Sequence, residues 1–137
     1  MTDADLVAKK LAFIETCVRE LRELAKPDLI DHDVRERRFV EHTLQLAIQA
    51  ALDAASHIVS DDRLGEPVTN HDLFRLLADA GWIGADLERA LRAAAGFRNV
   101  LVHGYTAVDV GIVKDVLENH LDDLLAFAAK VRGRLSP

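Results

Sequence analysis

The sequence is poor in the residues that build β-sheets and disulfide-stapled domains. Its 137 residues include one cysteine, one tryptophan, one tyrosine, five phenylalanines, seven glycines and three prolines. A β-sandwich or barrel normally needs more aromatic and β-branched residues and many glycine or proline turns. A single cysteine excludes a disulfide framework and a cysteine-only metal site, and it is typical of a reducing compartment. The length suits one domain, so we expect residues 1–137 to form a single unit.

The sequence also lacks an excess of positive charge and any long apolar run. There are 17 Lys and Arg residues against 23 Asp and Glu residues, which gives a formal net charge of −6. This balance argues against a protein that coats nucleic acid without regard to sequence, because such binding neutralises phosphates. The most apolar stretch, residues 44–59, contains Asp53 and is shorter than the roughly 20 residues of a membrane span. The chain starts with an acidic segment, unlike a secretory leader. We therefore expect a cytoplasmic protein without a membrane anchor.

Amphipathic helix patterns fill most of the chain. Asp3 or Asp5 can cap a first helix, which Pro27 ends. Between them, apolar residues alternate at spacings of four and three: Val7, Leu11, Ile14, Val18, Leu21 and Ala25. Phe13, Cys17 and Leu24 widen this stripe, so we interpret Cys17 as a core residue rather than a nucleophile.

The remaining pattern predicts four more helices. A second begins at Asp31 or Asp33 and runs to about Ser60, a short one runs from Thr69 or Asn70 through Ala80, and another runs from about Ala85 toward Gly96. A final helix begins at Asp109 and carries one apolar seam from Val110 to Val131. We predict an all-α fold, an up-and-down bundle of about five helices, with enough apolar surface left over for a homodimer interface.

A polar flank follows the second helix and allows two interpretations. His42, Gln49, Asp53 and Ser56 recur at spacings of seven, four and three, with His57 beside them. They form either a solvated stripe or a polar wall that faces a cleft. Candidate metal ligands are sparse: His57 with Asp61 and Asp62, His32 between Asp31 and Asp33, and His120 with Glu118 and Asp123. Such pairs are common in an Asp-rich chain, so we expect no metal and no cofactor.

The segment 96–105 concentrates groups that handle phosphates and protons. Arg98, Asn99, His103 and Tyr105 lie within eight residues, around the apolar residues 100–102. In a regular helix Arg98 and His103 would be about 140° apart around the axis. They can face one cleft only if the helix is irregular near Gly104, or if a second copy of the segment meets the first across a dimer interface.

The chemistry of this set suits RNA cleavage. Histidine can accept and donate a proton near neutral pH, and the arginine fork suits phosphate oxygens. Together they suffice for metal-independent attack of the RNA 2′-hydroxyl on its own phosphate, with Asn99 orienting either partner. The alternative is structural: Arg98 pairs with a nearby acid, while His103 and Tyr105 are polar residues of an interface.

Residues Arg98 to Tyr105 match the R-x-x-x-x-H-x-Y motif, and the sequence resembles the HepT-like toxins of the HEPN superfamily over nearly its whole length. The resemblance implies an all-helical homodimer whose two motifs meet in one cleft, with Arg98 and His103 as the catalytic pair of a metal-independent ribonuclease. It also implies a minimal nucleotidyltransferase antitoxin as partner, which transfers AMP to Tyr105. Asp53 corresponds to an inward polar residue of the family.

The functional hypothesis is therefore an endoribonuclease toxin of a type VII-like toxin–antitoxin pair, silenced by AMP on Tyr105. A non-enzymatic helical interaction subunit of a nucleotidyltransferase complex is the alternative, and a plain helical scaffold with a coincidental motif is a third. The acidic net charge confines RNA contacts to a small patch. Such a patch would hold Arg98 of both protomers, with Arg35, Arg37 and Arg38 either contributing or forming only a solvated helix start.

Overall fold

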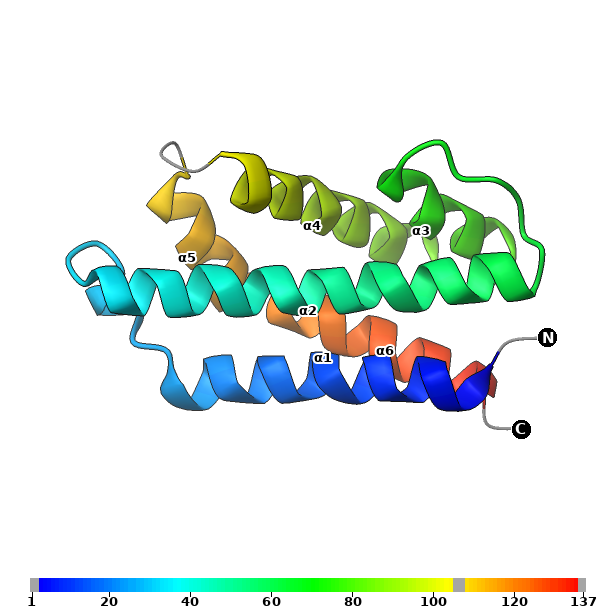
Figure 1. Cartoon of the computed structure of the whole chain (residues 1–137), viewed down its shortest axis with the longest axis horizontal. Helices are drawn as coiled ribbons and strands as arrows, with labels where there is room; N and C mark the ends of the chain where they lie inside the picture. Colours follow the sequence, from blue (N-terminus) through cyan, green and yellow to red (C-terminus); the bar gives the residue numbers. More distant parts are fainter. Residues whose placement is uncertain (1–2, 105–107, 136–137) are drawn as a thin grey trace.

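The computed structural model describes residues 3–104 and 108–135, and within these ranges every regular element is a helix (Figure 1). This confirms the all-α prediction. The elements are α1 (Ala4–Leu24), a short 3-10 helix η1 (Pro27–Leu29), α2 (Val34–Asp61), α3 (Asn70–Asp79), α4 (Ala85–His103), α5 (Val110–Asn119) and α6 (Leu121–Leu135). None of the described helices is long and apolar enough to cross a membrane.

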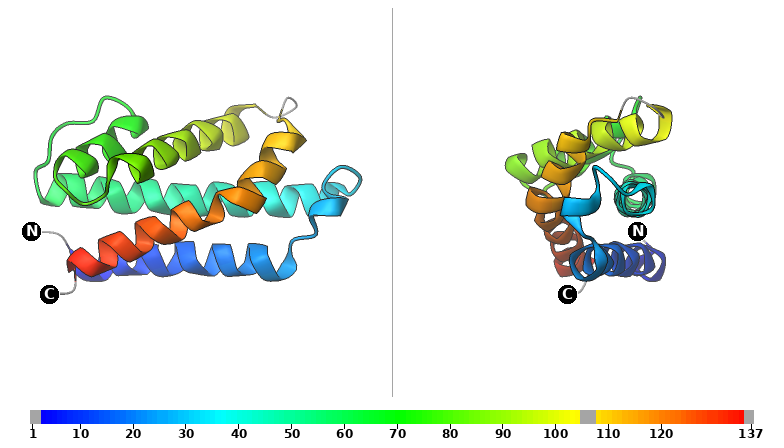
Figure 2. Two further views of the ribbon diagram at one scale, coloured as in Figure 1. Left: turned by 180° about the vertical axis from the view of Figure 1, so that it is seen from behind. Right: turned by 90° about the vertical axis from the view of Figure 1, so that its left-hand side faces the viewer.

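Helices α1 and α2 lie side by side and form the base on which the other elements pack (Figure 1). Figure 2 shows α5 and α6 crossing the back of this pair obliquely, while α3 and α4 follow α2 along its other side. The carboxyl end of α4 thereby comes to the same end of the molecule as the start of α2 (Figure 1). This arrangement positions the motif segment.

Aspartate caps decide where three of the helices begin. Asp3 accepts a hydrogen bond from the Leu6 amide at 3.1 Å, and Asp33 accepts one from the Arg35 amide at 2.8 Å. Asp109 accepts one from the Gly111 amide at 2.7 Å. Each such cap stabilises its helix by about 1 kcal/mol. Of the alternatives that the sequence left open, Asp3 and Asp33 are the residues that act.

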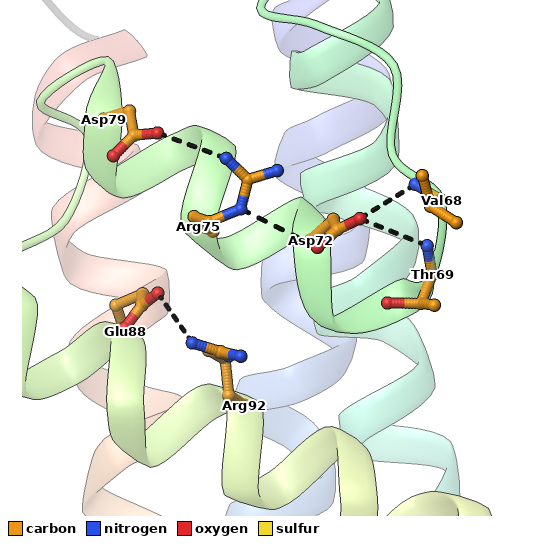
Figure 3. Close-up of polar contacts among 7 residues, drawn as sticks. All are labelled: Val68, Thr69, Asp72, Arg75, Asp79, Glu88 and Arg92. Atoms are coloured by element: carbon orange, nitrogen blue, oxygen red, sulfur yellow. Dashed lines mark hydrogen bonds and ion pairs between the residues drawn. The ribbon is translucent and has the colours of Figure 1, made fainter.

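A carboxylate also fixes the entry into α3 (Figure 3). Asp72 accepts hydrogen bonds from the backbone amides of Val68 at 2.9 Å and Thr69 at 3.4 Å. The Val68 hydrogen bond is the main cause that lowers the pKa of Asp72, and the nearby Arg75 acts in the same direction. Arg75 lies within 3.7 Å of Asp72 and 3.5 Å of Asp79, so one arginine links both ends of this helix.

The core consists of the predicted apolar stripes. Cys17 is 2% exposed, and burial, with a smaller contribution from Glu20, raises the pKa of its thiol to about 11. A thiol that stays protonated is a poor nucleophile, which confirms the core assignment. Phe13 and Leu24, expected to widen the same stripe, instead lie 42% and 57% exposed.

Two helix boundaries differ from the predictions. The helix expected to end near Gly96 continues to His103, because residues 97–102 include no helix breaker and Phe97 is buried. The single helix expected after Asp109 is divided at His120, whose backbone leaves the helical region at φ −122°, ψ 2°. The apolar seam nevertheless keeps to one face, since Val113, Leu117, Leu121, Leu124, Ala128 and Val131 are all buried.

Candidate functional site

The motif residues occupy the last turns of α4. Arg98, Asn99 and His103 all belong to the helix, and Gly104 is its C-cap, with its amide donating to the Val100 carbonyl at 2.7 Å. The helix is therefore regular across the motif, and Arg98 and His103 are about 140° apart around its axis. Of the two arrangements that the sequence allowed, an irregular helix between these residues is ruled out.

Arg98 is held by its neighbour in the chain. Its Nη1 donates to the Oδ1 of Asn99 at 3.2 Å, and both side chains are half-buried. Its Nε is buried and has no hydrogen-bond partner among the described residues. No described carboxylate lies within ion-pair distance of this guanidinium, so the structural alternative, pairing with a nearby acid, finds no support in this part of the chain. Arg98 keeps donors that can bind an anion.

A polar groove of about 730 Å³ lies beside this side of α4. We call it the α2–α4 groove; it is lined by Arg37, Arg38, Glu41, His42 and Gln45 of α2, by Leu101 of α4 and by Val108. Leu101 is three residues after Arg98 and shares its side of the helix. The sequence had drawn attention to the arginines, His42 and the motif segment that contains Leu101, but not to Glu41, Gln45 and Val108, because a groove between two helices leaves no periodic signal in either.

An apolar hollow of about 230 Å³ lies on another side of α4. Its lining includes Gly96 and Val100 of α4 and Ile112 of α5, and Val100 and Ile112 are 48% and 52% exposed. His103 is exposed and follows Val100 by three residues, so it lies toward this hollow rather than toward the groove. One protomer thus presents Arg98 and His103 on different sides of one helix.

Asp53 is engaged away from the motif. Its carboxylate accepts a hydrogen bond from Gln49 Nε2 at 2.8 Å and lies 3.5 Å from Lys10 Nζ of α1. Neither contact involves the motif. The polar flank of α2 is accordingly divided: His42 lines the groove, Gln49 and Asp53 form a network with α1, and Ser56 is exposed. It is neither a single wall nor wholly solvated.

Tyr105 lies outside the described residues. Among the described residues no three His, Cys, Asp or Glu side chains are grouped to hold a metal ion. His120 contacts Asp123 at 3.1 Å and Asp115 at 3.2 Å, rather than the expected Glu118.

Comparison with known proteins links this geometry to a family. Residues 14–131 match the family model described as Ribonuclease HepT-like. The chain is 31% identical over 130 residues to an mRNA nuclease HepT of Shewanella oneidensis, covering 94% of this chain and 98% of that protein. It is 28% identical over 106 residues to a tRNA nuclease HepT of Aphanizomenon flos-aquae, covering 76% and 72%. A solved structure of a tri-AMPylated Shewanella oneidensis HEPN toxin in complex with an MNT antitoxin superposes with a TM-score of 0.87 at 29% identity, covering 97% of this chain and 99% of that one.

Proposed function

Because the chain belongs to the family of HepT-like ribonucleases, we propose that it is a metal-independent endoribonuclease, the toxin of a type VII-like toxin–antitoxin pair that acts on RNA in the cytoplasm. The observation that carries this proposal is the motif itself: an arginine held by Asn99 but free of a described acid, and an exposed histidine on the same helix. A non-enzymatic scaffold would not need an arginine with unused donors.

The proposed chemistry uses the 2′-hydroxyl of the RNA. His103 removes the proton of this hydroxyl, and the 2′-oxygen attacks the adjacent phosphorus. Arg98 stabilises the negative charge that builds on the phosphate oxygens. The bond from phosphorus to the 5′-oxygen breaks, and the leaving oxygen takes a proton from a protonated His103. The products are a 2′,3′-cyclic phosphate and a 5′-hydroxyl.

This chemistry calls for a homodimer. The regular helix separates Arg98 and His103 within one protomer, so both reach one phosphate only if two copies of α4 meet. The apolar hollow at Val100 and Ile112 is the surface that supports such a contact, because exposed apolar patches of this kind are typical of interfaces. A two-fold axis beside this surface, at the carboxyl ends of the two α4 helices, would bring the two motifs into one cleft.

We propose that a minimal nucleotidyltransferase silences the toxin by transferring AMP to Tyr105. This residue is two positions after His103 and is the single tyrosine of the chain. A nucleotide attached there adds a negative phosphodiester, which repels an incoming RNA phosphate and occupies space beside the histidine. The tri-AMPylated HEPN toxin that the fold resembles supports this regulation.

Cleavage in EDTA tests the catalytic proposal. Purified unmodified protein should cut single-stranded RNA and leave a 2′,3′-cyclic phosphate, whereas a DNA strand of the same sequence should stay intact. Removing the arginine or the histidine, with Arg98→Ala or His103→Ala, should lower the rate by about 100-fold or more. Arg89→Ala and His32→Ala are matched controls outside the motif and should cleave normally. Cleavage that survives in both motif variants would refute the mechanism.

Mass spectrometry tests the regulation. Co-expression with the cognate nucleotidyltransferase should raise the mass of the protein by one or more AMP units and abolish cleavage. Tyr105→Phe should remain unmodified and active, since it keeps the ring but loses the acceptor oxygen. An AMP adduct on the Tyr105→Phe variant would show that another residue is the acceptor.

A further inference from the structure

The α2–α4 groove has a composition that the catalytic motif does not explain. It combines two arginines, one glutamate, one histidine and one glutamine with the apolar side chains of Leu101 and Val108. Its volume of about 730 Å³ lies within the roughly 300–1,000 Å³ of pockets that hold small organic ligands. We propose that this groove is a subsite for the RNA strand, in which Arg37 and Arg38 bind a phosphate next to the one that is cleaved. This inference rests on the proposed ribonuclease function and names where its substrate lies.

Neither arginine of the groove is paired with a described acid. Five arginines of the described chain have a carboxylate within 4 Å, which compensates their charge: Arg22, Arg75, Arg89, Arg92 and Arg132. Arg37 and Arg38 form no side-chain hydrogen bond or ion pair with a described residue, although the chain carries a net charge of −6. Two guanidinium groups that line one groove without an ion pair to a described acid can form a local anion site in an acidic protein.

The acidic side chains near the groove do not neutralise its two arginines. Asp33 caps α2, and Glu36 accepts a hydrogen bond from the Lys26 amide at 2.9 Å. Glu41 is the one acid among the residues that line the groove, so two arginines outweigh one carboxylate and the lining keeps a net positive charge. A phosphate of charge −1 would therefore be attracted rather than repelled.

The groove adjoins the motif at the right place for a continuing strand. Leu101 belongs to the groove and lies one helical turn beyond Arg98. The apolar surfaces of Leu101 and Val108 suit the flat face of a base or ribose, while Gln45 offers a donor and an acceptor to a base edge. A strand held at Arg98 by one phosphate can thus enter the groove with the next nucleotide.

Binding to a cleavage-silent protein tests the proposal without relying on catalysis. In the His103→Ala background, the double substitution Arg37→Ala with Arg38→Ala should weaken binding of a labelled single-stranded RNA by about tenfold or more. The slope of log affinity against log salt should become shallower by about 0.7 for each phosphate that the protein no longer neutralises. Arg38→Lys should restore part of the affinity, because it keeps the charge but not the fork.

Arg35→Ala is the matched control. Arg35 lies in the first turn of the same helix, and its substitution removes one positive charge, as each of the two groove substitutions does, but it does not line the groove. The RNA affinity of this variant should stay within about twofold of the parent, by the ordinary scale of screened surface charges. Circular dichroism of all variants checks the fold. Equal losses for Arg35→Ala and the groove variants, or no loss for either, would overturn the subsite.

The outcomes separate this inference from the proposed function. If the groove variants lose RNA affinity while the wild type cleaves nothing, the groove binds RNA but the proposed ribonuclease mechanism is wrong. If the wild type cleaves and the groove variants bind and cleave as it does, the groove alone is wrong. Groove variants that bind RNA normally but lose the nucleotidyltransferase would also overturn the proposal, because the arginines would then face a protein.

Discussion

His120 lies at the joint between α5 and α6, where both ring nitrogens face carboxylates. Its hydrogen bond with Asp123 is the main cause that raises its pKa above 6.5, and Asp115 acts in the same direction on the other nitrogen. The folded protein therefore favours the protonated ring. The stabilisation is fully present below the unfolded pKa of about 6.5 and is lost as the pH rises through the higher folded pKa.

This sign gives a prediction for stability. The wild type should melt at a higher temperature than His120→Gln. This difference should be largest below pH 6.5 and should shrink as the pH rises above that value. The ring is half exposed, so the effect is small. Thermal unfolding of both proteins at several pH values measures it. A difference that grows with pH would show that the ring acts as a neutral hydrogen-bond donor instead.

The chemistry of Arg98 could be predicted from the sequence, by its residue type and its place in the motif, but its hydrogen-bond partner could not. The sequence allowed Asn99 to orient either the arginine or the histidine, and in the structure Asn99 accepts a hydrogen bond from Arg98. The sequence shows that Arg98 and Asn99 are neighbours. Which side chain Asn99 contacts depends on the side-chain rotamers at the end of α4, which the sequence does not give.

At the scale of elements, the last turns of α4 hold the proposed catalytic residues Arg98 and His103. Gly104 closes the helix directly after His103, with its amide 2.7 Å from the Val100 carbonyl oxygen. A Cβ added to Gly104 would lie 2.5 Å from that same oxygen, which is closer than any normal contact. The backbone would have to move, and His103 would move with it.

Gly104→Ala should therefore impair catalysis more than folding. We expect cleavage to fall by about tenfold or more, because small displacements of catalytic groups are costly. Gly133→Ala, in α6, is the control: nothing lies within 4 Å of its added Cβ, and it should stabilise the helix by about 0.5–1 kcal/mol. Rates and melting temperatures of both variants measure this. Wild-type cleavage by Gly104→Ala would show that the cap tolerates the shift.

The helix boundaries illustrate a limit of periodicity. The pattern predicted the buried face of α5 and α6 correctly, because burial depends on which side each residue faces. It missed the interruption at His120 because one non-helical residue barely changes a seam that repeats every seven residues. The extension of α4 past Gly96 was missed for the opposite reason, since a glycine in a helix is tolerated when its neighbours pack.

At the scale of the whole molecule, the apolar hollow around Val100 and Ile112 is the surface at which we propose that two copies meet to complete the active site. A charge placed there should prevent two copies from meeting. We expect Val100→Glu to weaken the dimer by about tenfold or more and to reduce cleavage in parallel. Val68→Glu is the control, since Val68 is 89% exposed in the loop before α3 and lies outside the hollow. Sedimentation and cleavage measured over protein concentration would test this, and a dimeric, active Val100→Glu protein would place the interface elsewhere.

The sequence by itself determined the helical class, most of the buried stripes, the aspartate caps to within two residues and the motif, because each depends on spacing along one chain and on residue chemistry. The tertiary structure decided what lies between helices. It drew Asp53 toward Lys10, assembled the groove from α2 and α4, and placed Arg98 and His103 on different sides of a regular helix. Those features depend on how the helices pack against one another, and packing joins residues that are distant along the chain and that no local pattern connects.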